Sequence, residues 1–413
     1  MSTEDMSARE LLAHFSARLE DEATEVKKNG GLVCWSASVA PPELCVAMDI
    51  AMVYPENHSA AIGARKGSLP LLEIADQKGY NRDTCSYGRV NMGYMELLKR
   101  QAMTGERPEA LQDFPAATPP LPDLVITCNN ICNTLLKWYE NLAAELNIPC
   151  IIIDVPFNHT MPVPEYAKEY LAAQFEYAKK RLEKICGRPF DEEKFLEAQK
   201  QTQRSVEQWD RVASMLAHKP SPLNGFDLFN FMALIVTARS RDYAEITFRK
   251  FADELEENLK NGKYAFGDNE KSRVTWEGIA VWTYLGHTFK SLRNMGSLMT
   301  GSAYPGMWSL RYTPGDLKSM GEAYTRVYIN CCLEYRAEVL TEVVRSGKCD
   351  GLLAHMNRSC KLMSLLNYDT AELVRKKLKV PYVAFDGDQT DPRNFAPAQF
   401  DTRVQSLVEM MDR

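Results

Sequence analysis

The chain has no long apolar run and no surplus of positive charge. No stretch of its 413 residues approaches the roughly 20 apolar residues of a membrane-spanning helix. The opening segment MSTEDMSAREL also lacks the basic and then apolar pattern of a signal peptide. With 49 Lys and Arg against 55 Asp and Glu, the net charge is -6, whereas a nucleic-acid surface needs clustered cations. We therefore expect a cytoplasmic protein that binds neither membranes nor nucleic acids.

Several nucleotide and hydrolase motifs are also missing. No G-x-G-x-x-G follows the first predicted strand, and the segment GARKGS at 63–68 lacks the GK[ST] ending of a phosphate-binding loop. The G-x-S-x-G pattern of many hydrolases does not occur either. Any ATP that the function requires would therefore be hydrolysed on another protein.

Eleven cysteines, an odd number, do not indicate a disulfide framework in a cytoplasmic chain of this length. Most of them lie in apolar or helical contexts, where a free cysteine behaves as a small buried hydrophobe. We interpret seven in this way: Cys34, Cys45, Cys150, Cys186, Cys331, Cys332 and Cys349.

The segment from Asp123 to Asp154, DLVITCNNICNTLLKWYENLAAELNIPCIIID, predicts a strand, a turn with cysteines, a helix and a second strand. Its short apolar runs LVI and III are typical of buried parallel strands. Apolar residues recur at helical spacing between them, and Pro149 prevents the helix from continuing. The resulting βαβ crossover places Cys128 and Cys132 at the carboxyl end of its first strand, where such folds bind their ligands.

A second segment, from Asp350 to Asp386, repeats this plan as DGLLAHMNRSCKLMSLLNYDTAELVRKKLKVPYVAFD. Asn129-x-x-Cys132 in the first segment is echoed by Asn357-x-x-Cys360 in the second. Two half-chains that place a thiol at the same topological point predict a site shared by two lobes.

These units predict an α/β protein with two Rossmann-like parallel-sheet lobes and a helical segment between them. The predicted boundaries give an N-terminal lobe with an N-terminal helix at 1–165, a helical layer at 166–268 and a C-terminal lobe at 269–413. The helical layer follows from an almost continuous helical pattern after residue 164.

Four local expectations accompany this fold. We expect loops at 55–58 and 296–306, because proline, asparagine or glycine accumulate there. Met320–Ser346 is predicted to be one long helix. Residues 80–89 are predicted to be a turn that carries Cys85 and leads into a helix from Val90.

Polar residues follow the first two predicted strands. Ser36 and Ser38 after one strand and Glu56 after the next are expected to converge on one crevice. Glu56 could serve as a base or only as a loop carboxylate. We interpret four histidines as structural and three tryptophans as core residues rather than cofactor-stacking residues: His58, His159, His287 and His355, and Trp276, Trp282 and Trp308.

Cys85, Cys132 and Cys360 each fall on a turn at a strand end or a helix start. Three thiolates could hold an iron–sulfur cluster and leave one iron open to an oxygen ligand, which a fourth cysteine would block. The spacing matches neither a ferredoxin run nor paired zinc motifs, so unrelated core thiols are the alternative. Near a helix N-terminus, Cys85 would feel the helix dipole, which favours its thiolate. The internal echo favours Cys132 over Cys128 as the partner of Cys360.

At these positions the chain resembles the benzoyl-CoA reductase and 2-hydroxyacyl-CoA dehydratase family. The resemblance covers nearly the whole chain, and its motifs are long and occur in order. The motifs are WSASVAPPE (35–43), YPENH (54–58), CSYGR (85–89), CNNICNTLLKWYENLAAEL (128–146), NRSCK (357–361) and DGDQTDPR (386–393).

The resemblance implies a heterodimer with a homologous beta subunit, in which each subunit holds one [4Fe-4S] cluster through three cysteines. Carried over by motif, the ligands here would be Cys85, Cys132 and Cys360, with Cys128 in place of Cys132 left open. Ser38 would contact the substrate, and Glu56 would be the candidate base. A separate ATP-dependent iron–sulfur activator would inject one electron, and whether the partner subunit carries a flavin stays open.

The implied reaction is the reversible dehydration of a 2-hydroxyacyl-CoA, (R)-lactoyl-CoA to acryloyl-CoA or a close homologue, through a ketyl radical. Two alternatives stay open. One is a reductive, benzoyl-CoA-reductase-like subunit, and the other is a non-catalytic subunit that only transfers electrons. The sequence does not decide the acyl chain length or the residues that contact CoA.

Overall fold

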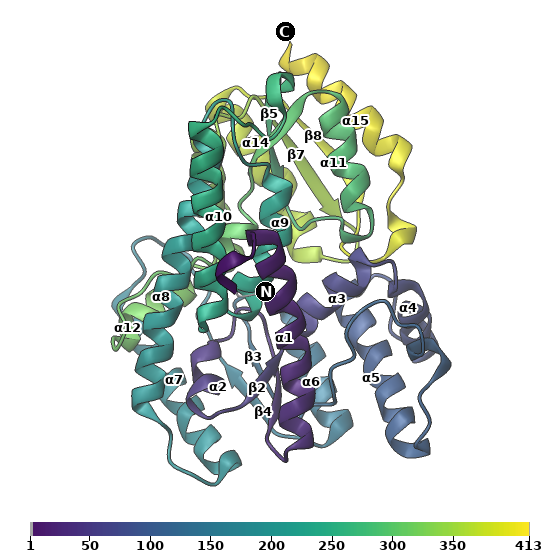
Figure 1. The fold of residues 1–413 in the computed structure, drawn as a ribbon, viewed down its shortest axis with the longest axis vertical. Coiled ribbons are helices and arrows are strands. Elements are labelled where there is room, and N and C mark those ends of the chain that lie inside the picture. The colour runs from purple at the N-terminus through teal and green to yellow at the C-terminus, as the bar shows by residue number, and fades with distance from the viewer. Residues whose placement is uncertain (1–2, 413) are drawn as a thin grey trace.

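Two parallel β-sheets, each flanked by helices, form the framework of the computed structural model, which describes residues 3–412 (Figure 1). The first sheet has the order β2-β1-β3-β4 and the second the order β6-β5-β7-β8, so the second repeats the topology of the first. The predicted α/β fold with two parallel-sheet lobes is confirmed. The strands are β1 (Val33–Ser36), β2 (Ala51–Val53), β3 (Leu124–Cys128), β4 (Cys150–Ile153), β5 (Ser272–Glu277), β6 (Ser297–Gly301), β7 (Gly351–Asn357) and β8 (Tyr382–Gly387).

Helices cover the sheets, and a group of them runs alongside both lobes. In Figure 1, α7, α8 and α10 follow one another along one side of the molecule, from the first lobe to the second. The domain boundaries at 165/166 and 268/269 stay a prediction. The helices are α1 (Ala8–Lys28), α2 (Pro42–Ala47), α3 (Pro55–Ala64), α4 (Ser68–Gln77), α5 (Ser86–Thr104), α6 (Asn133–Leu146), α7 (Glu165–Cys186), α8 (Glu192–Ser214), α9 (Gly225–Thr237), α10 (Asp242–Lys260), α11 (Leu285–Asn294), α12 (Leu317–Thr325), α13 (Leu333–Ser346), α14 (Lys361–Leu378) and α15 (Pro397–Met411).

The two predicted crossovers have the same construction. The strand β3 is fully buried, as expected for an apolar run inside a parallel sheet covered on both faces. The helix α6 then buries Trp138, Tyr139 and Leu142 at helical spacing and ends at Asn147, which adopts the left-handed conformation. In the second lobe, β7 is followed by α14, which ends in the same way at Lys379. Both helices therefore begin at the carboxyl end of a central strand.

Two of the predicted loops contain regular structure. Residues 55–58 form the first turn of α3, because Pro55 occupies the first helical turn, where its fixed φ suits the helix. Residues 296–306 include the buried strand β6. Gly301 pairs with Thr275 there, and a Cβ on Gly301 would lie 2.6 Å from the Thr275 hydroxyl oxygen. This glycine therefore permits a close strand contact rather than a turn.

The predicted long helix over Met320–Ser346 is interrupted. It is divided into α12 and α13 by a segment that includes a 3-10 turn at Tyr328–Asn330. The Asn330 side-chain amide donates to the carbonyl oxygens of Pro156 at 2.9 Å and Thr325 at 3.0 Å, and the Asn158 amide donates to the Asn330 carbonyl at 2.9 Å. Hydrogen bonds to a distant segment thus replace helical ones.

None of the helices formed by residues 3–412 combines the length and apolar character that a membrane span requires. The largest fully buried side chains include Trp35 of β1, Trp276 of β5 and Tyr94 of α5. A hydrophobic core of this kind positions the strand ends on which the polar residues lie.

A close helix contact supports the start of α5. Gly93 of α5 faces α4 so closely that a Cβ there would lie 2.2 Å from the Leu71 carbonyl oxygen. Gly93→Ala should therefore lower the free energy of unfolding by about 1–3 kcal/mol through overpacking. Thermal melting measures the effect. Gly286→Ala is the control, because nothing lies within 4 Å of the added Cβ in α11; equal melting temperatures for the two variants would contradict the packing argument.

Candidate active-site cavity

Cys85, Cys132 and Cys360 line one cavity of about 270 Å³ that lies between the two lobes. Each of them is the N-cap residue of a helix: Cys85 of α5, Cys132 of α6 and Cys360 of α14. The predicted start of α5 at Val90 is wrong by four residues, because the helix already begins at Ser86. Among the described residues, the cavity lining contains no fourth cysteine, and Cys128 is buried outside it.

Hydrogen bonds between the lobes hold the start of α5 against the second lobe. The backbone amide of Ser86 donates to Ser359 Oγ at 3.1 Å, and its hydroxyl donates to Asp388 Oδ1 at 2.6 Å. The buried Arg89 forms an ion pair with Asp391 at 3.4 Å. Since Ser359 directly precedes Cys360, these contacts bring Cys85 and Cys360 to the same cavity.

Burial dominates the protonation of the three thiols. It raises the pKa of Cys85, and the neighbouring Cys360 and Cys132 raise that pKa further. Burial also raises the pKa of Cys132, and it raises the pKa of Cys360 to about 12. Backbone amides at the helix starts oppose this shift, for example that of Leu135, which donates to Cys132 Sγ at 3.3 Å. The expected stabilisation of the Cys85 thiolate by its helix N-terminus is therefore present but outweighed by burial.

The three thiols line one cavity but are not arranged around a single metal ion. Within residues 3–412, no group of three or more His, Cys, Asp and Glu side chains could hold one metal ion. In a cubane cluster each cysteine binds a different iron, so its ligands surround a larger group from several sides. Gln389 Nε2 also donates to Cys85 Sγ at 3.1 Å, and Asn357 Nδ2 fixes Gln389 by donating to its Oε1 at 2.8 Å. Such donors are typical of the surroundings of cluster sulfurs.

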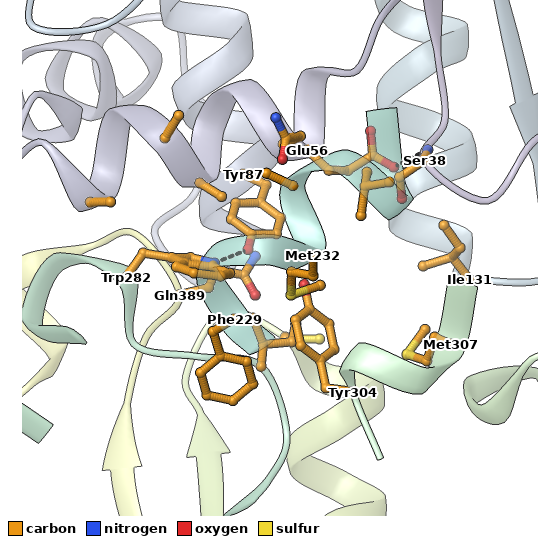
Figure 2. Close-up of a pocket in the computed structure, with 18 of the residues that line it drawn as sticks. Ser38, Glu56, Tyr87, Ile131, Phe229, Met232, Trp282, Tyr304, Met307 and Gln389 are labelled. Atoms are coloured by element: carbon orange, nitrogen blue, oxygen red, sulfur yellow. Dashed lines mark hydrogen bonds between the residues drawn. The ribbon is translucent and has the colours of Figure 1, made fainter. Parts of the chain in front are cut away.

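Of the three polar residues predicted to converge, Ser38 and Glu56 do so, whereas Ser36 is buried and does not line the cavity. Ser38 and Glu56 both line it, and the backbone amide of Ser38 donates to Glu56 Oε1 at 2.9 Å. The Tyr139 hydroxyl, which comes from α6, donates to Glu56 Oε2 at 2.5 Å. Figure 2 shows Ser38 and Glu56 side by side at one end of the cavity. Glu56 lies in the first turn of α3 and is therefore not a loop carboxylate.

Burial raises the pKa of Glu56, whereas the hydrogen bonds from Ser38 and Tyr139 partly oppose this shift. Only 9% of the residue is exposed. A raised pKa makes a carboxylate more basic, which is a property of general bases.

The turn at Ser38 is fixed by residues from distant segments. The buried Arg239, just after α9, donates to the Ser38 carbonyl at 3.0 Å and to the Ala40 carbonyl at 2.7 Å. Trp308 Nε1 also donates to the Ser38 carbonyl at 3.0 Å. Sequence reasoning missed both residues that hold these two side chains in place, Arg239 and Tyr139. Arg239 lies in none of the quoted motifs, and Tyr139 lies in the motif at 128–146 but reaches Glu56 only through the tertiary fold.

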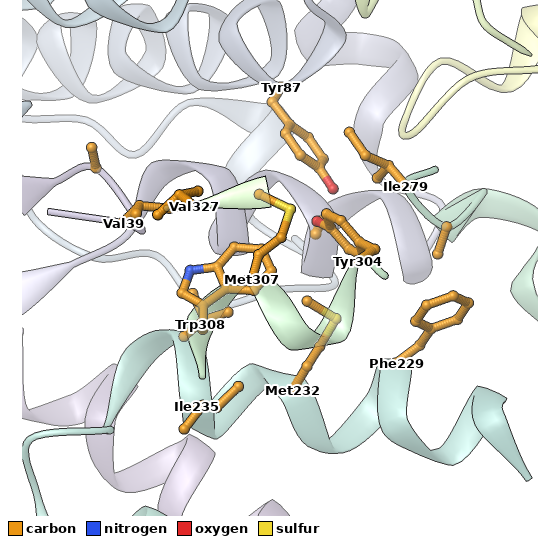
Figure 3. Packing of buried hydrophobic residues seen from close by; sticks show 14 of the residues in the cluster. Val39, Tyr87, Phe229, Met232, Ile235, Ile279, Tyr304, Met307, Trp308 and Val327 are labelled. Carbon is orange, nitrogen blue, oxygen red and sulfur yellow. The ribbon is translucent and has the colours of Figure 1, made fainter. Parts of the chain in front are cut away.

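Aromatic and apolar side chains form the rest of the wall. Tyr87 of the first lobe and Tyr304 of the second face one another, and Trp282 Nε1 donates to the Tyr87 hydroxyl (Figures 2 and 3). Met232 and Met307 pack beside Tyr304 (Figure 3). Burial raises the pKa of both tyrosines, so their hydroxyls stay neutral. Trp282 and Trp308 are buried, as predicted, but they also line the cavity.

The remaining candidates lie outside the cavity. His58 Nε2 is 2.8 Å from the Ala117 carbonyl oxygen, and His355 Nδ1 is 2.6 Å from that of Ile279. His287 pairs with Asp401, in line with a structural role. Of the seven cysteines predicted to be buried hydrophobes, four are buried, whereas Cys150, Cys186 and Cys332 are partly exposed.

Comparisons with known proteins show which family the chain belongs to. Residues 37–411 match the family model described as 2-hydroxyglutaryl-CoA dehydratase, D-component. The chain belongs to this family. It is 66% identical to the lactoyl-CoA dehydratase subunit alpha of Anaerotignum propionicum, over 99% of this chain and 98% of the relative. It is 43% identical to the (R)-2-hydroxyisocaproyl-CoA dehydratase alpha subunit of Clostridioides difficile, over 99% and 97%. A benzoyl-CoA reductase polypeptide of Thauera aromatica is 24% identical over 90% and 86%. The predicted family and the predicted enzyme class, a hydro-lyase of the dehydratase type, are confirmed.

The raised pKa of Glu56 predicts a pH-dependent stability. The Glu56 carboxyl group keeps its proton to a higher pH in the folded chain than in the unfolded chain. The free energy of unfolding therefore falls as the pH rises from the unfolded pKa of Glu56 toward its folded pKa. Glu56→Gln has no proton to lose. Its melting temperature relative to the wild type should therefore rise as the pH increases from about 4.3, the unfolded value of a glutamate, toward the higher folded pKa. Glu342→Gln on the exposed face of α13 is the control; a constant difference for Glu56→Gln over this range would contradict the burial argument.

Proposed function

We propose that this chain is the subunit of an oxygen-sensitive [4Fe-4S] 2-hydroxyacyl-CoA dehydratase that reversibly converts (R)-lactoyl-CoA to acryloyl-CoA. The observation that carries the proposal is the meeting of three N-cap cysteines with Ser38 and Glu56 in one cavity. The 66% identity to a lactoyl-CoA dehydratase subunit over nearly the full length supports the choice of substrate.

The reaction explains why such a site is needed. In a 2-hydroxyacyl thioester the hydrogen on carbon 3 is not acidic, because its carbanion is not conjugated with the carbonyl group. The hydroxyl on carbon 2 is also badly placed to leave. One electron added to the thioester carbonyl gives a ketyl radical that can expel this hydroxyl. The resulting enoxy radical has an acidic hydrogen on carbon 3. After a base removes this proton, the radical anion gives the electron back and becomes the enoyl-CoA.

Cys85, Cys132 and Cys360 would hold the cluster from three helix N-termini. When bound, a cluster with three cysteine ligands supplies an electron relay and one iron that is open to a substrate oxygen. The neutral tyrosines and the apolar side chains around the thiols would limit the access of water to them. A dry surrounding protects a radical and strengthens each electrostatic contact with the substrate.

Glu56 would remove the carbon-3 proton. Its carboxylate is held in one orientation by the Ser38 amide and the Tyr139 hydroxyl, and burial raises its pKa toward the pH at which a base works efficiently. Ser38, which the Arg239 guanidinium and the Trp308 indole hold by its carbonyl oxygen, would contact the substrate beside it.

Other proteins would supply the electron and complete the enzyme. The chain carries no phosphate-binding loop, so ATP hydrolysis would take place on a separate iron–sulfur activator. Several relatives are named as alpha subunits, which supports a heterodimer with a homologous beta subunit. The reductive alternative has less support, because the benzoyl-CoA reductase polypeptide is only 24% identical.

Iron content tests the ligand assignment. Anaerobically purified wild-type protein should contain about four irons per chain in a [4Fe-4S] cluster. Cys85→Ala, Cys132→Ala and Cys360→Ala should each lose most of that iron, whereas Cys128→Ala and Cys349→Ala should keep it. Full iron content in Cys360→Ala would refute the assignment, and loss in Cys128→Ala but not in Cys132→Ala would move the second ligand to Cys128.

Substrate turnover tests the reaction itself. The complex with the beta subunit, activated by the iron–sulfur protein and ATP, should dehydrate (R)-lactoyl-CoA, and Glu56→Gln should lower kcat by at least about 100-fold, the typical contribution of a general base. Reduction of benzoyl-CoA without dehydration of lactoyl-CoA would favour the reductive alternative. Full activity of Glu56→Gln would rule out Glu56 as the base.

A further inference from the structure

The cavity that holds the thiols continues toward the molecular surface. Its outer end is lined by Ser16 and Glu20 of α1, Arg65 after α3, Asn230 of α9 and Leu285 of α11. Two further hollows share lining residues with this end. One of about 80 Å³ shares Ser16 and Glu20, and one of about 560 Å³ shares Asn230 and Leu285.

We call the larger hollow the outer pocket. Its lining carries two cations, Arg9 and Lys263, together with the side-chain amides of Asn230 and Asn258. Tyr264 and Phe289 add aromatic rings. Cations, amides and aromatic rings are the groups that bind phosphates, the polar edge of a purine and its ring faces, respectively. The chemistry of the outer pocket thus differs from that of the largely apolar thiol cavity.

Lys263 is the cation that is available to a ligand. Arg9 Nη2 already pairs with Asp227 Oδ1 at 2.7 Å, whereas Lys263 forms no ion pair within residues 3–412. The backbone around Lys263 is fixed, because its amide donates to the Asn258 carbonyl at 2.8 Å and the Ala265 amide donates to the Ser221 carbonyl at 2.9 Å. A free ammonium group on a fixed turn can therefore pair with an anion that enters the pocket.

The helix α1 forms a wall of both spaces. Arg9 lies in the outer pocket, and Ser16 and Glu20, seven and eleven residues later, lie at the end of the thiol cavity. These spacings place the three residues on the same side of the helix, and seven residues of helix correspond to roughly 10 Å. An extended, mostly alkyl and amide arm such as pantetheine can cover this distance. The two spaces are therefore arranged like the two ends of a CoA thioester.

We propose that the outer pocket binds the 3′-phospho-ADP end of the CoA thioester, with Lys263 pairing with a phosphate group. The pantetheine arm passes Asn230 and Leu285, and the acyl end reaches the three thiols and Glu56. This assignment rests on the proposed function, since it is the CoA thioester that links the two spaces. The smaller hollow is not an alternative, because its volume is about 80 Å³ and neither Lys nor Arg lines it within the described chain.

Lys263→Glu tests the assignment in the complete enzyme with its partner subunit and activator. Two substrates are compared, the lactoyl thioester of CoA and that of pantetheine, which lacks the nucleotide. Charge reversal should raise KM for the CoA thioester by about tenfold and leave kcat unchanged, because only ground-state binding of the phosphates is lost. The pantetheine thioester should show no change in KM. Lys377→Glu, which makes the same charge change on α14 away from both spaces, should behave like the wild type.

An equal change for both thioesters, or no change for either, would overturn the assignment. If the wild-type enzyme dehydrates neither thioester, the proposed function fails, and calorimetry with 3′-phosphoadenosine 5′-diphosphate then decides on the pocket alone. Binding that Lys263→Glu weakens and Lys377→Glu does not would support the nucleotide subsite. Absence of binding, or equal binding by all three proteins, would rule it out.

Discussion

The convergence of three helix N-termini on one cavity is the constraint on which the rest of the structure depends. Two of these helices follow from the βαβ topology, because α6 and α14 must begin where β3 and β7 end. The third, α5, is held there by Ser86 and Arg89, which contact the second lobe. Each helix places a cysteine at its N-cap and backbone amides around the sulfur, so the site has a partial positive charge before any ligand enters.

Burial and hydrogen bonding act against each other throughout the cavity. Burial raises the pKa values of the thiols and of Glu56, whereas helix amides and the Tyr139 hydroxyl favour their charged forms. For a thiolate, a bound iron–sulfur cluster would decide this balance, because a metal-coordinated thiol loses its proton. For Glu56, burial raises the pKa while the hydrogen bonds from Ser38 and Tyr139 hold the carboxylate in one orientation. One dry, apolar cavity thus serves both purposes.

Much of this could be predicted from the sequence, because repeats and apolar periodicity report directly on parallel crossovers. The echo between Asn129-x-x-Cys132 and Asn357-x-x-Cys360 predicted a thiol at the same topological point of each lobe, and in the structure both thiols are helix N-caps that line one cavity. Two local predictions were wrong for different reasons. Pro55 begins a helix, which the fixed φ of proline allows from the sequence alone, whereas Gly301 lies in a strand because of a close neighbour in the tertiary fold. The contacts of Arg239 with Ser38 and of Tyr139 with Glu56 could not be predicted, since the partners lie about 200 and 80 residues apart in sequence.

The most direct measurement is an anomalous-difference map at the iron absorption edge, from crystals of the anaerobically prepared protein. The account predicts one compact iron peak between the lobes, in contact with the sulfurs of Cys85, Cys132 and Cys360 and with no fourth protein sulfur. An iron peak bound elsewhere, or a map without iron in which the three thiols remain separate, would contradict it.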